Sequence, residues 1–325
     1  MFEFLRKYIL QLFVSVIVED DKVIIRTNTF RKNKTISVYE KTFDDKEKAF
    51  LYIKDLSKNF EIYYIGVLLS FKEQGLVPTL NELDIDNFNL DHTSLKTINL
   101  KNSQVYVNSD EFKSAIDFFD KYSGVDFAYS PISILYYCIQ KQFKNNSKTT
   151  CYVYKDEFCI SVLVCKDDDI LFGDFFKIDK VNSSDISYEK KTKDIETSDN
   201  LEKENSDEID ENEKQEENLD NIDDENHTEE LNLLEDEKNN LNLNNFSDDM
   251  DMCRYIFSKI DEFYNNSNYN SSFIEELVIF SNTHCKEDFI VDHIENEIFL
   301  KPQIIQIDTL DLIIELMHKE LDNGL

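Results

Sequence analysis

The sequence predicts an α/β protein made of two halves with the same order of elements. Residues 13–43 and 150–178 are both rich in β-branched and aromatic residues, and short polar breaks divide each segment into three strands. Helical and strand-like patterns alternate after each of these segments. We therefore expect two units, each of which begins with three strands and continues with helices and further strands.

The first half contains clear helix starts. Ser109 is a good N-cap residue, and Ser130-Pro131 places a proline at the first position of a helix. The block 71–108 shows little regular period apart from strand-like pieces around 97–100 and 104–107, so we expect it to be a small inserted subdomain. The other expected elements are strands at 13–19, 22–30 and 36–43, a helix at 44–59, a strand at 61–70, a helix at 109–122, a strand at 125–129 and a helix from 130.

The second half repeats this order. Its expected elements are strands at 150–154, 158–165 and 170–178, a helix at 252–265, a strand at 273–281, a helix at 287–300, a strand at 303–308 and a helix at 310–321. At the other end of the chain, the apolar but interrupted stretch 1–11 is interpreted as a short helix.

An acidic stretch interrupts the second half. Residues 181–251 contain no Gly, Pro or Cys and only two aromatic residues, and 185–251 carry 26 Asp and Glu against 6 Lys. Such a composition buries too little apolar surface to offset the entropy of ordering, so we expect a disordered acidic linker. The predicted organisation is a short helix at 1–11, a first half and the start of the second at 12–180, the linker at 181–251 and the remainder of the second half at 252–325.

Composition excludes several classes of function. The chain has a formal net charge of -32, which disfavours nucleic acid and anionic membranes as direct partners. Only 5 of the 325 residues are glycine, and they form none of the glycine-rich loops that cradle phosphates. No stretch of 18 apolar residues is present, so we expect no membrane span. The six cysteines lie mostly in apolar runs without Cys-x-x-Cys spacing, which favours reduced core residues of a cytosolic protein.

The order of elements resembles the duplicated plan of the actin-like ATPases, and especially the type IV pilus protein PilM and the cytoplasmic domain of the type II secretion protein GspL. Two stretches carry the resemblance. Asp120-Lys-Tyr-Ser-Gly-Val-Asp126 with Ser130-Pro-Ile-Ser-Ile-Leu-Tyr136 is similar to the step into the crossover helix of the first half. Tyr255–Tyr264 with Phe273-Ile-Glu-Glu-Leu-Val-Ile-Phe-Ser281 is similar to the late helix and strand of the second half.

The chain departs from this family where nucleotide would bind. Members that bind ATP carry glycine turns in the first hairpin of each half and a glycine pair after the late strand. The corresponding stretches here read Val16-Ile-Val-Glu-Asp-Asp-Lys22, Val153-Tyr-Lys-Asp-Glu-Phe158 and Ile279-Phe-Ser-Asn-Thr283. They lack glycine, and the hairpins place carboxylates where phosphates would lie, so we expect no ATP site.

We expect no cofactor, no catalytic residue and no metal site. His284, Cys285 and His293 match no ligand spacing, and Asp167-Asp168-Asp169 lacks the pattern of a calcium loop.

The resemblance implies a non-catalytic cytoplasmic scaffold of a bacterial envelope machine, such as a pilus, a secretion system or a flagellar motor accessory. Its implied partner is the cytoplasmic tail of a bitopic, PilN-like inner-membrane protein that recruits it to the membrane, and self-association is left open. Leu80, Leu83 and Phe88 in the inserted block are the predicted partner-binding residues. Two alternatives remain: an actin-like ATPase with an atypical nucleotide pocket, and an acidic adaptor unrelated to this family.

Overall fold

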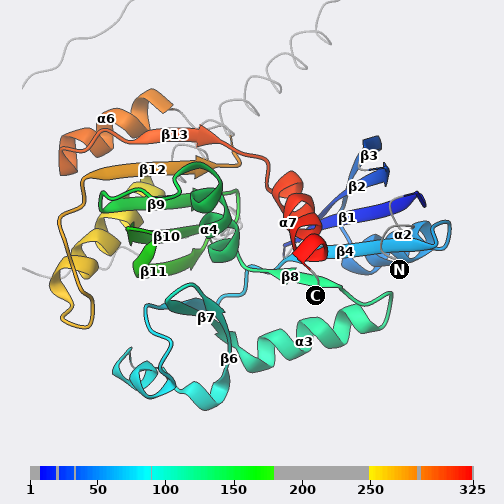
Figure 1. Cartoon of the computed structure of the whole chain (residues 1–325), viewed down its shortest axis with the longest axis horizontal. Helices are drawn as coiled ribbons and strands as arrows, with labels where there is room; N and C mark the ends of the chain where they lie inside the picture. Colours follow the sequence, from blue (N-terminus) through cyan, green and yellow to red (C-terminus); the bar gives the residue numbers. More distant parts are fainter. Residues whose placement is uncertain are drawn as a thin grey trace, which may run out of the picture. The chain divides into compact units, whose positions relative to one another are not determined.

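In the computed structural model, which describes residues 8–19, 22–32, 34–88, 90–178, 249–283 and 287–323, two five-stranded sheets have the same topology (Figure 1). In each sheet the first three strands are antiparallel, and the remaining two run parallel to the first. The first sheet has the order β3-β2-β1-β4-β8, with β1 (Gln11–Val18), β2 (Val23–Arg31), β3 (Lys34–Phe43), β4 (Ile62–Leu68) and β8 (Phe127–Tyr129).

The second sheet repeats this order, including an irregularity. It is arranged as β11-β10-β9-β12-β13, with β9 (Thr150–Lys155), β10 (Cys159–Lys166), β11 (Asp169–Lys177), β12 (Glu276–Ser281) and β13 (Gln303–Gln306). The pairing shifts by one residue between Thr29 and Phe30 in β2 and between Val164 and Cys165 in β10. The predicted α/β fold with two similar halves is therefore confirmed.

Alternation along the central strands divides the apolar residues between two layers. In β1, Val14 and Val16 face α2 (Lys46–Ser57) and α3 (Ser109–Asp120). In β9, Cys151 and Val153 face the helix over residues 249–265 and α6 (Glu287–Ile298). Both strands are buried on both faces, which is why they read as continuous apolar runs.

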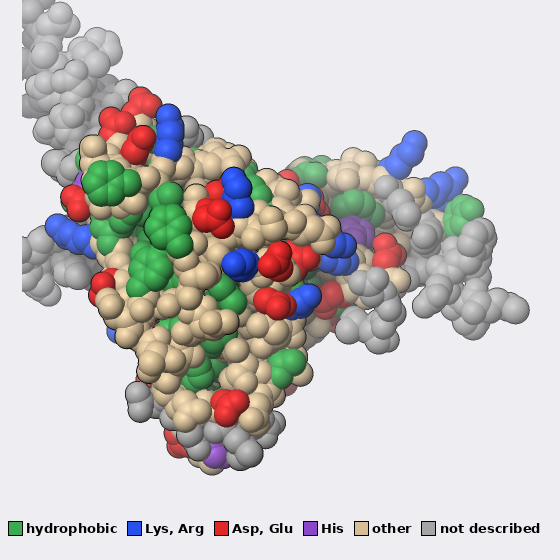
Figure 2. Space-filling view, turned by 60° about the vertical axis from the view of Figure 1, so that its left-hand side comes forward, with side chains coloured by type: hydrophobic (Ala, Val, Ile, Leu, Met, Phe, Trp, Pro, Cys, Tyr) green, Lys and Arg blue, Asp and Glu red, His purple; other side chains and the backbone are tan. Residues whose placement is uncertain are grey.

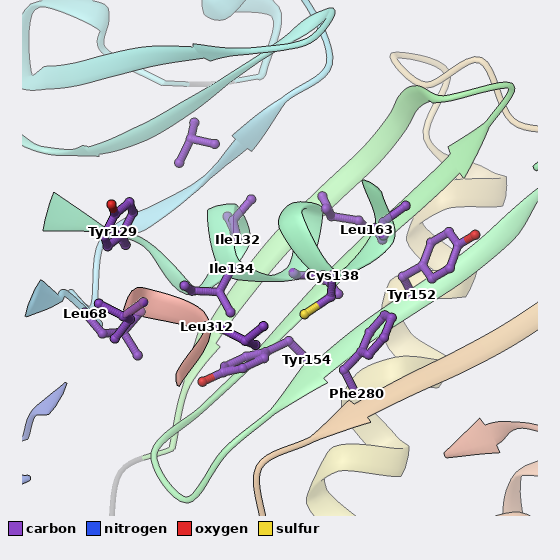
Figure 3. Packing of buried hydrophobic residues seen from close by; sticks show 14 of the residues in the cluster. Leu68, Tyr129, Ile132, Ile134, Cys138, Tyr152, Tyr154, Leu163, Phe280 and Leu312 are labelled. Atoms are coloured by element: carbon purple, nitrogen blue, oxygen red, sulfur yellow. The ribbon is translucent and has the colours of Figure 1, made fainter. Parts of the chain in front are cut away.

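The last helix of each half packs on the sheet of the other half. α4 (Pro131–Gln142) contacts β9, β10 and β11, whereas α7 (Thr309–Asn323) contacts β1 and β4. The inward side chains of both sheets and both helices form one core (Figure 3). The approach of α7 requires Gly66 in β4, because an added Cβ would lie 2.8 Å from the sulfur of Met317 and 2.9 Å from Cγ2 of Ile313.

The inserted block is more regular than the sequence predicts. It forms an antiparallel sheet of order β5-β7-β6 and two short 3₁₀ helices. The elements are β5 (Gln74–Val77), η1 (Glu82–Phe88), η2 (His92–Ser94), β6 (Leu95–Leu100) and β7 (Ser103–Asn108). β5 escapes sequence analysis because all four of its residues are buried and the strand shows no alternation.

The expectation for residues 1–11 is wrong where it can be compared. Residues 8–10 are not helical, and Gln11 is already in β1, paired with Phe30 and Ile62. Residues 1–7 and nearly all of the predicted linker at 181–251 lie outside the described residues. Cys138, Cys151, Cys159, Cys165 and Cys253 are buried and free. Within the described ranges, no helix is long and apolar enough to cross a lipid bilayer.

Candidate functional site

Two β-hairpins, one from each half, approach one another at the place where the resemblance puts the phosphates of a nucleotide. β1 and β2 form the first, and β9 and β10 form the second. Glu19 and Lys22 flank the first turn, which is closed by a hydrogen bond of 2.9 Å from the Glu19 N–H to the Lys22 carbonyl. Asp156 and Glu157 form the second turn. The site therefore depends on the duplicated fold, since it uses the same position in both halves.

A lysine connects the two hairpins. The Lys22 ammonium lies 2.5 Å from Oε2 of Glu157 and 4.8 Å from the centre of the Phe158 ring. Lys22 is thus held by an ion pair and a cation–π contact from the opposite half. This ion pair joins the two hairpins directly.

The Asp156 carboxylate accepts hydrogen bonds from groups inside the second hairpin. Its Oδ1 accepts hydrogen bonds from the backbone N–H groups of Phe158 (2.8 Å) and Cys159 (2.7 Å), and its Oδ2 accepts one from the Tyr154 hydroxyl (2.8 Å). Burial raises the pKa of Asp156 even though these three bonds favour the ionised form. The backbone amides that could bind a phosphate in such a turn are therefore already bound to a carboxylate of the chain itself.

Other polar groups beside the hairpins also have partners among the described residues. Lys155 forms a buried ion pair with Asp249, at the start of the described part of the helix over 249–265. Glu19 is 3% exposed and accepts a hydrogen bond of 2.9 Å from the Ser70 hydroxyl. Asn282, after the late strand β12, accepts a bond of 3.0 Å from the Thr309 N–H at the start of α7. These contacts satisfy polar groups around each hairpin.

Metal ligation finds little support in the described residues. There, no group of three or more His, Cys, Asp or Glu side chains is placed to hold a metal ion. His284 and Cys285 lie outside the described residues, while His293 stacks on Phe289 at 5.8 Å. Asp168 accepts a hydrogen bond of 2.9 Å from the Asn145 N–H within a turn.

A groove of about 330 Å³ lies between the inserted sheet and the helices α4 and α7. Its walls come from β6, β8, α4 and α7. They consist of Ile98, Leu100, Ala128, Tyr129, Ser133, Tyr136, Tyr137, Gln140, Leu316, Lys319 and Glu320. Ile98 is 57% exposed, so an apolar side chain stands open at its rim.

Polar groups in this groove are partly desolvated. Burial and the charge of Glu320 raise the pKa of the Tyr129 hydroxyl, and burial raises the pKa of Glu320. The Nε2 amide nitrogen of Gln140 is buried and has no hydrogen-bond partner among the described residues. At the side of the groove, Glu315 accepts hydrogen bonds from Tyr137 (3.2 Å) and Lys141 (2.6 Å). The groove thus combines apolar walls with a buried amide nitrogen that has no partner among the described residues.

Of the three predicted partner-binding residues, Leu80 and Phe88 are not part of the lining of this groove. Leu80 is 48% exposed and lies in a loop of the inserted block. Phe88 is half-buried, and its ring lies 5.6 Å from that of Tyr269, so it helps to attach the insertion to the second half. The side chain of Leu83 lies outside the described part of the structure. Ile98 lies in a strand piece that the sequence predicts, but the sequence did not identify it as a residue of this groove. The exposure of a side chain on an edge strand leaves no signal in the sequence.

Exposed apolar side chains also occur away from the groove. Phe273 and Phe299 are 75% and 86% exposed. Figure 2 shows several exposed hydrophobic side chains in the left part of the face that it draws. Phe299 has a positive φ of 56°, which is unfavourable for a bulky residue. Nothing in the structure indicates what would cover these side chains.

Two family models match this chain, one in each half. Residues 151–322 match the family described as Domain of unknown function (DUF8341), and this match spans more than half of the chain. The chain belongs to this family. Residues 9–136 of this DUF8341 member match a second model, Domain of unknown function (DUF8569). None of the curated proteins compared with the chain matches it.

Solved structures show the fold of this DUF8341 member. A Bacteroides thetaiotaomicron protein with actin-like ATPase fold and unknown function is similar over 98% of this chain and 99% of its own, with a TM-score of 0.50 and 9% identity. The predicted actin-like fold is therefore confirmed. The PilM-PilN type IV pilus biogenesis complex contains a chain that is similar over 90% of this chain and 87% of its own, with a TM-score of 0.48 and 7% identity. An exopolyphosphatase from Cytophaga hutchinsonii is similar over 52% of this chain and 51% of its own, with a TM-score of 0.29 and 8% identity.

Proposed function

We propose that this protein is a non-catalytic cytoplasmic scaffold of a cell-envelope machine and that it binds the cytoplasmic tail of a PilN-like membrane protein. The observation that carries the proposal is the groove between β6, α4 and α7. The groove joins the inserted subdomain to both halves, as expected for a binding site built into this fold.

The chemistry of the groove suits an extended peptide. Ile98, Leu100 and Leu316 offer apolar contacts to an anchoring side chain. A turn of the Gln140 side chain toward the groove brings its amide nitrogen to a backbone carbonyl of the peptide, and such a bond relieves an unsatisfied polar group. A membrane-proximal tail is a peptide of this kind, and the order of elements resembles proteins of pilus and secretion machines.

The ion pair between Lys22 and Glu157 and the occupied hairpin amides support the non-catalytic part of the proposal. A nucleotide would have to separate the hairpins and displace the Asp156 carboxylate, and the neighbouring carboxylates would repel its phosphates.

The groove is tested with a synthetic peptide of the cytoplasmic tail of the PilN-like protein from the same organism. We expect Ile98→Ser and Gln140→Leu to weaken binding at least about tenfold, or about 1.4 kcal/mol, while the melting temperature stays close to that of the unchanged protein. Calorimetry gives the affinity. Leu80→Ser is the matched control, because Leu80 is an exposed apolar residue of the same insertion outside the groove. Loss of binding in Leu80→Ser with full binding in Ile98→Ser would place the partner on the outer surface of the insertion.

A further inference from the structure

The outer edge of β3 is unpaired by any strand that the structure describes. In the described part of the chain, this strand of 10 residues pairs with β2 alone. Its side chains are exposed on both faces, including Ile36 (62%), Val38 (51%) and Tyr39 (68%). A long edge strand with exposed apolar side chains is a ready template for another strand.

The duplicated fold supplies a direct comparison for this edge, because β11 is the equivalent strand of the second half. In the first half, Phe30 pairs with Thr35 and Thr29 with Ser37, so the pairing passes over Ile36. In the second half, Cys165 pairs with Ile170 and Val164 with Phe172, so the pairing passes over Leu171. Counting from this shared irregularity, Thr35 corresponds to Ile170 and Val38 corresponds to Gly173.

The equivalent edge of β11 is covered by the inserted sheet. The side-chain amide of Asn102 donates to the Ile170 carbonyl and accepts from the Ile170 N–H, each at 2.9 Å, as a neighbouring strand would. β5 lies against β11, and a Cβ added to Gly173 would lie 2.8 Å from Leu163 and 3.0 Å from Leu76, so Leu76 packs on the face of the sheet beside this edge. The same position in the first half carries Thr35 and Val38, both exposed. The edge of β11 is thus bonded at Ile170 by the inserted block, whereas in the described part of the chain β3 is paired with β2 alone.

The positive charge along the outer edge of β3 favours an acidic binding partner. Four cations lie on β3 or at its turn with β2, namely Arg31, Lys32, Lys34 and Lys41, in a chain whose net charge is -32. The one carboxylate of β3, Glu40, is held by Arg26 at 2.6 Å. Two copies of β3 would bring like charges together, which disfavours pairing between copies of this chain. An acidic strand would instead meet lysines along the edge.

We propose that the outer edge of β3 binds an extended acidic segment of a partner protein by strand addition. Main-chain hydrogen bonds to β3 hold the segment, the lysines select its charge, and Ile36, Val38 and Tyr39 contact its apolar side chains. This surface is separate from the groove proposed for the PilN-like tail, whose lining includes no residue of β3.

The test uses the full-length protein and three fluorescein-labelled peptides with the length of β3, 10 residues. The first alternates Glu with Val and Thr, the second has Lys in place of every Glu, and the third is the first with a central Pro. We expect the Glu peptide to bind at least about tenfold more tightly than either of the others in fluorescence anisotropy, because Lys reverses the charge and Pro interrupts the strand. Hydrogen exchange of the β3 amides should slow only with the Glu peptide.

Matched variants locate the site. Lys34→Glu with Ile36→Glu should weaken binding of the Glu peptide at least about tenfold. Lys48→Glu with Leu51→Glu makes the same change of charge and apolar surface on α2, where Leu51 is 49% exposed, and should leave binding unchanged. Melting curves confirm that both variants fold. Absence of Glu-peptide binding, equal binding of all three peptides, or equal weakening by both variants would overturn the proposal. Dimerisation that protects the β3 amides without peptide would also overturn it, in favour of a second copy.

Discussion

The Asp156 side chain binds the backbone N–H groups of its own hairpin turn. It lies 2% exposed in the β9–β10 turn and satisfies two backbone N–H groups and the Tyr154 hydroxyl. Tyr154 in turn lies 2.9 Å from the Thr309 hydroxyl of α7. A carboxylate in the turn therefore joins the second sheet to the helix that packs on the first.

Replacing this carboxylate should destabilise the fold. Asp156→Ala leaves three buried donors without their acceptor, and we expect the free energy of unfolding to fall by about 3 kcal/mol. Asp156→Asn keeps one acceptor oxygen and should cost less. Urea denaturation measures both values. The control is Asp91→Ala, which removes an exposed carboxylate from a similar turn and should have a smaller effect.

The same residue predicts a dependence on pH. Burial raises the pKa of Asp156 above its ordinary value of 3.8, so the folded chain holds this proton more tightly than the unfolded chain. The stability that this provides is fully present below pH 3.8 and is lost as the pH rises through the folded pKa. The unchanged protein should therefore gain stability relative to Asp156→Asn when the pH is lowered from 7 toward about 4. A constant difference between the two proteins would contradict the assigned cause.

At the scale of elements, the facing hairpins decide whether nucleotide can bind. Lys22 and Glu157 join them, and the β9–β10 amides are already occupied by Asp156. We expect neither ATP nor ADP to bind at millimolar concentration in calorimetry. A dissociation constant near or below roughly 100 μM, equivalent to about 5.5 kcal/mol, would favour the alternative of an atypical nucleotide pocket.

A double variant distinguishes the ion pair between the hairpins from the occupied backbone amides as the cause of the expected lack of nucleotide binding. Lys22→Ala with Glu157→Ala removes the bridge between the hairpins but leaves Asp156 in place. We expect this variant also to bind no nucleotide, because the backbone donors remain occupied. Binding that appears only in this variant would show that the ion pair alone closes the site.

At the scale of the whole molecule, neither half is complete without the other. α7 comes from the end of the chain but packs on β1 and β4, and α4 comes from the first half but packs on β9, β10 and β11. The resulting core includes fully buried residues of both sheets, among them Phe13 and Tyr154.

Because α4 and α7 each pack on the sheet of the other half, we expect two separate chains, 1–178 and 249–325, to assemble when they are produced together. They should co-purify and unfold in one transition, because β12 pairs with β9 and α7 packs on β1. Met317→Asp, in the buried face of α7, should prevent assembly, while Lys319→Asp on its exposed side should not. Sedimentation measures the complex. Two fragments that remain apart without denaturant would indicate independent domains.

The amino-acid sequence by itself determined most of the secondary structure and its duplication, with β5 as an exception. Apolar runs such as 159–166 and the helix start at Ser130-Pro131 are local signals, and the structure places β10 and α4 there. The absence of glycine from the two hairpins was equally visible. These features depend on neighbouring residues in the chain, so they can be read without knowledge of the fold.

Only the tertiary structure decided which distant residues meet. The Lys22–Glu157 bridge spans 135 positions, and the groove combines Ile98 with Gln140 and Glu320. The sequence prediction of Leu80, Leu83 and Phe88 could not anticipate that groove, because no local pattern shows which side of an inserted strand the exchanged helices approach. The difference between β3 and β11 has the same cause. Among the described residues, the insertion packs beside β11 but β3 pairs with β2 alone, and this choice is made by packing across the molecule.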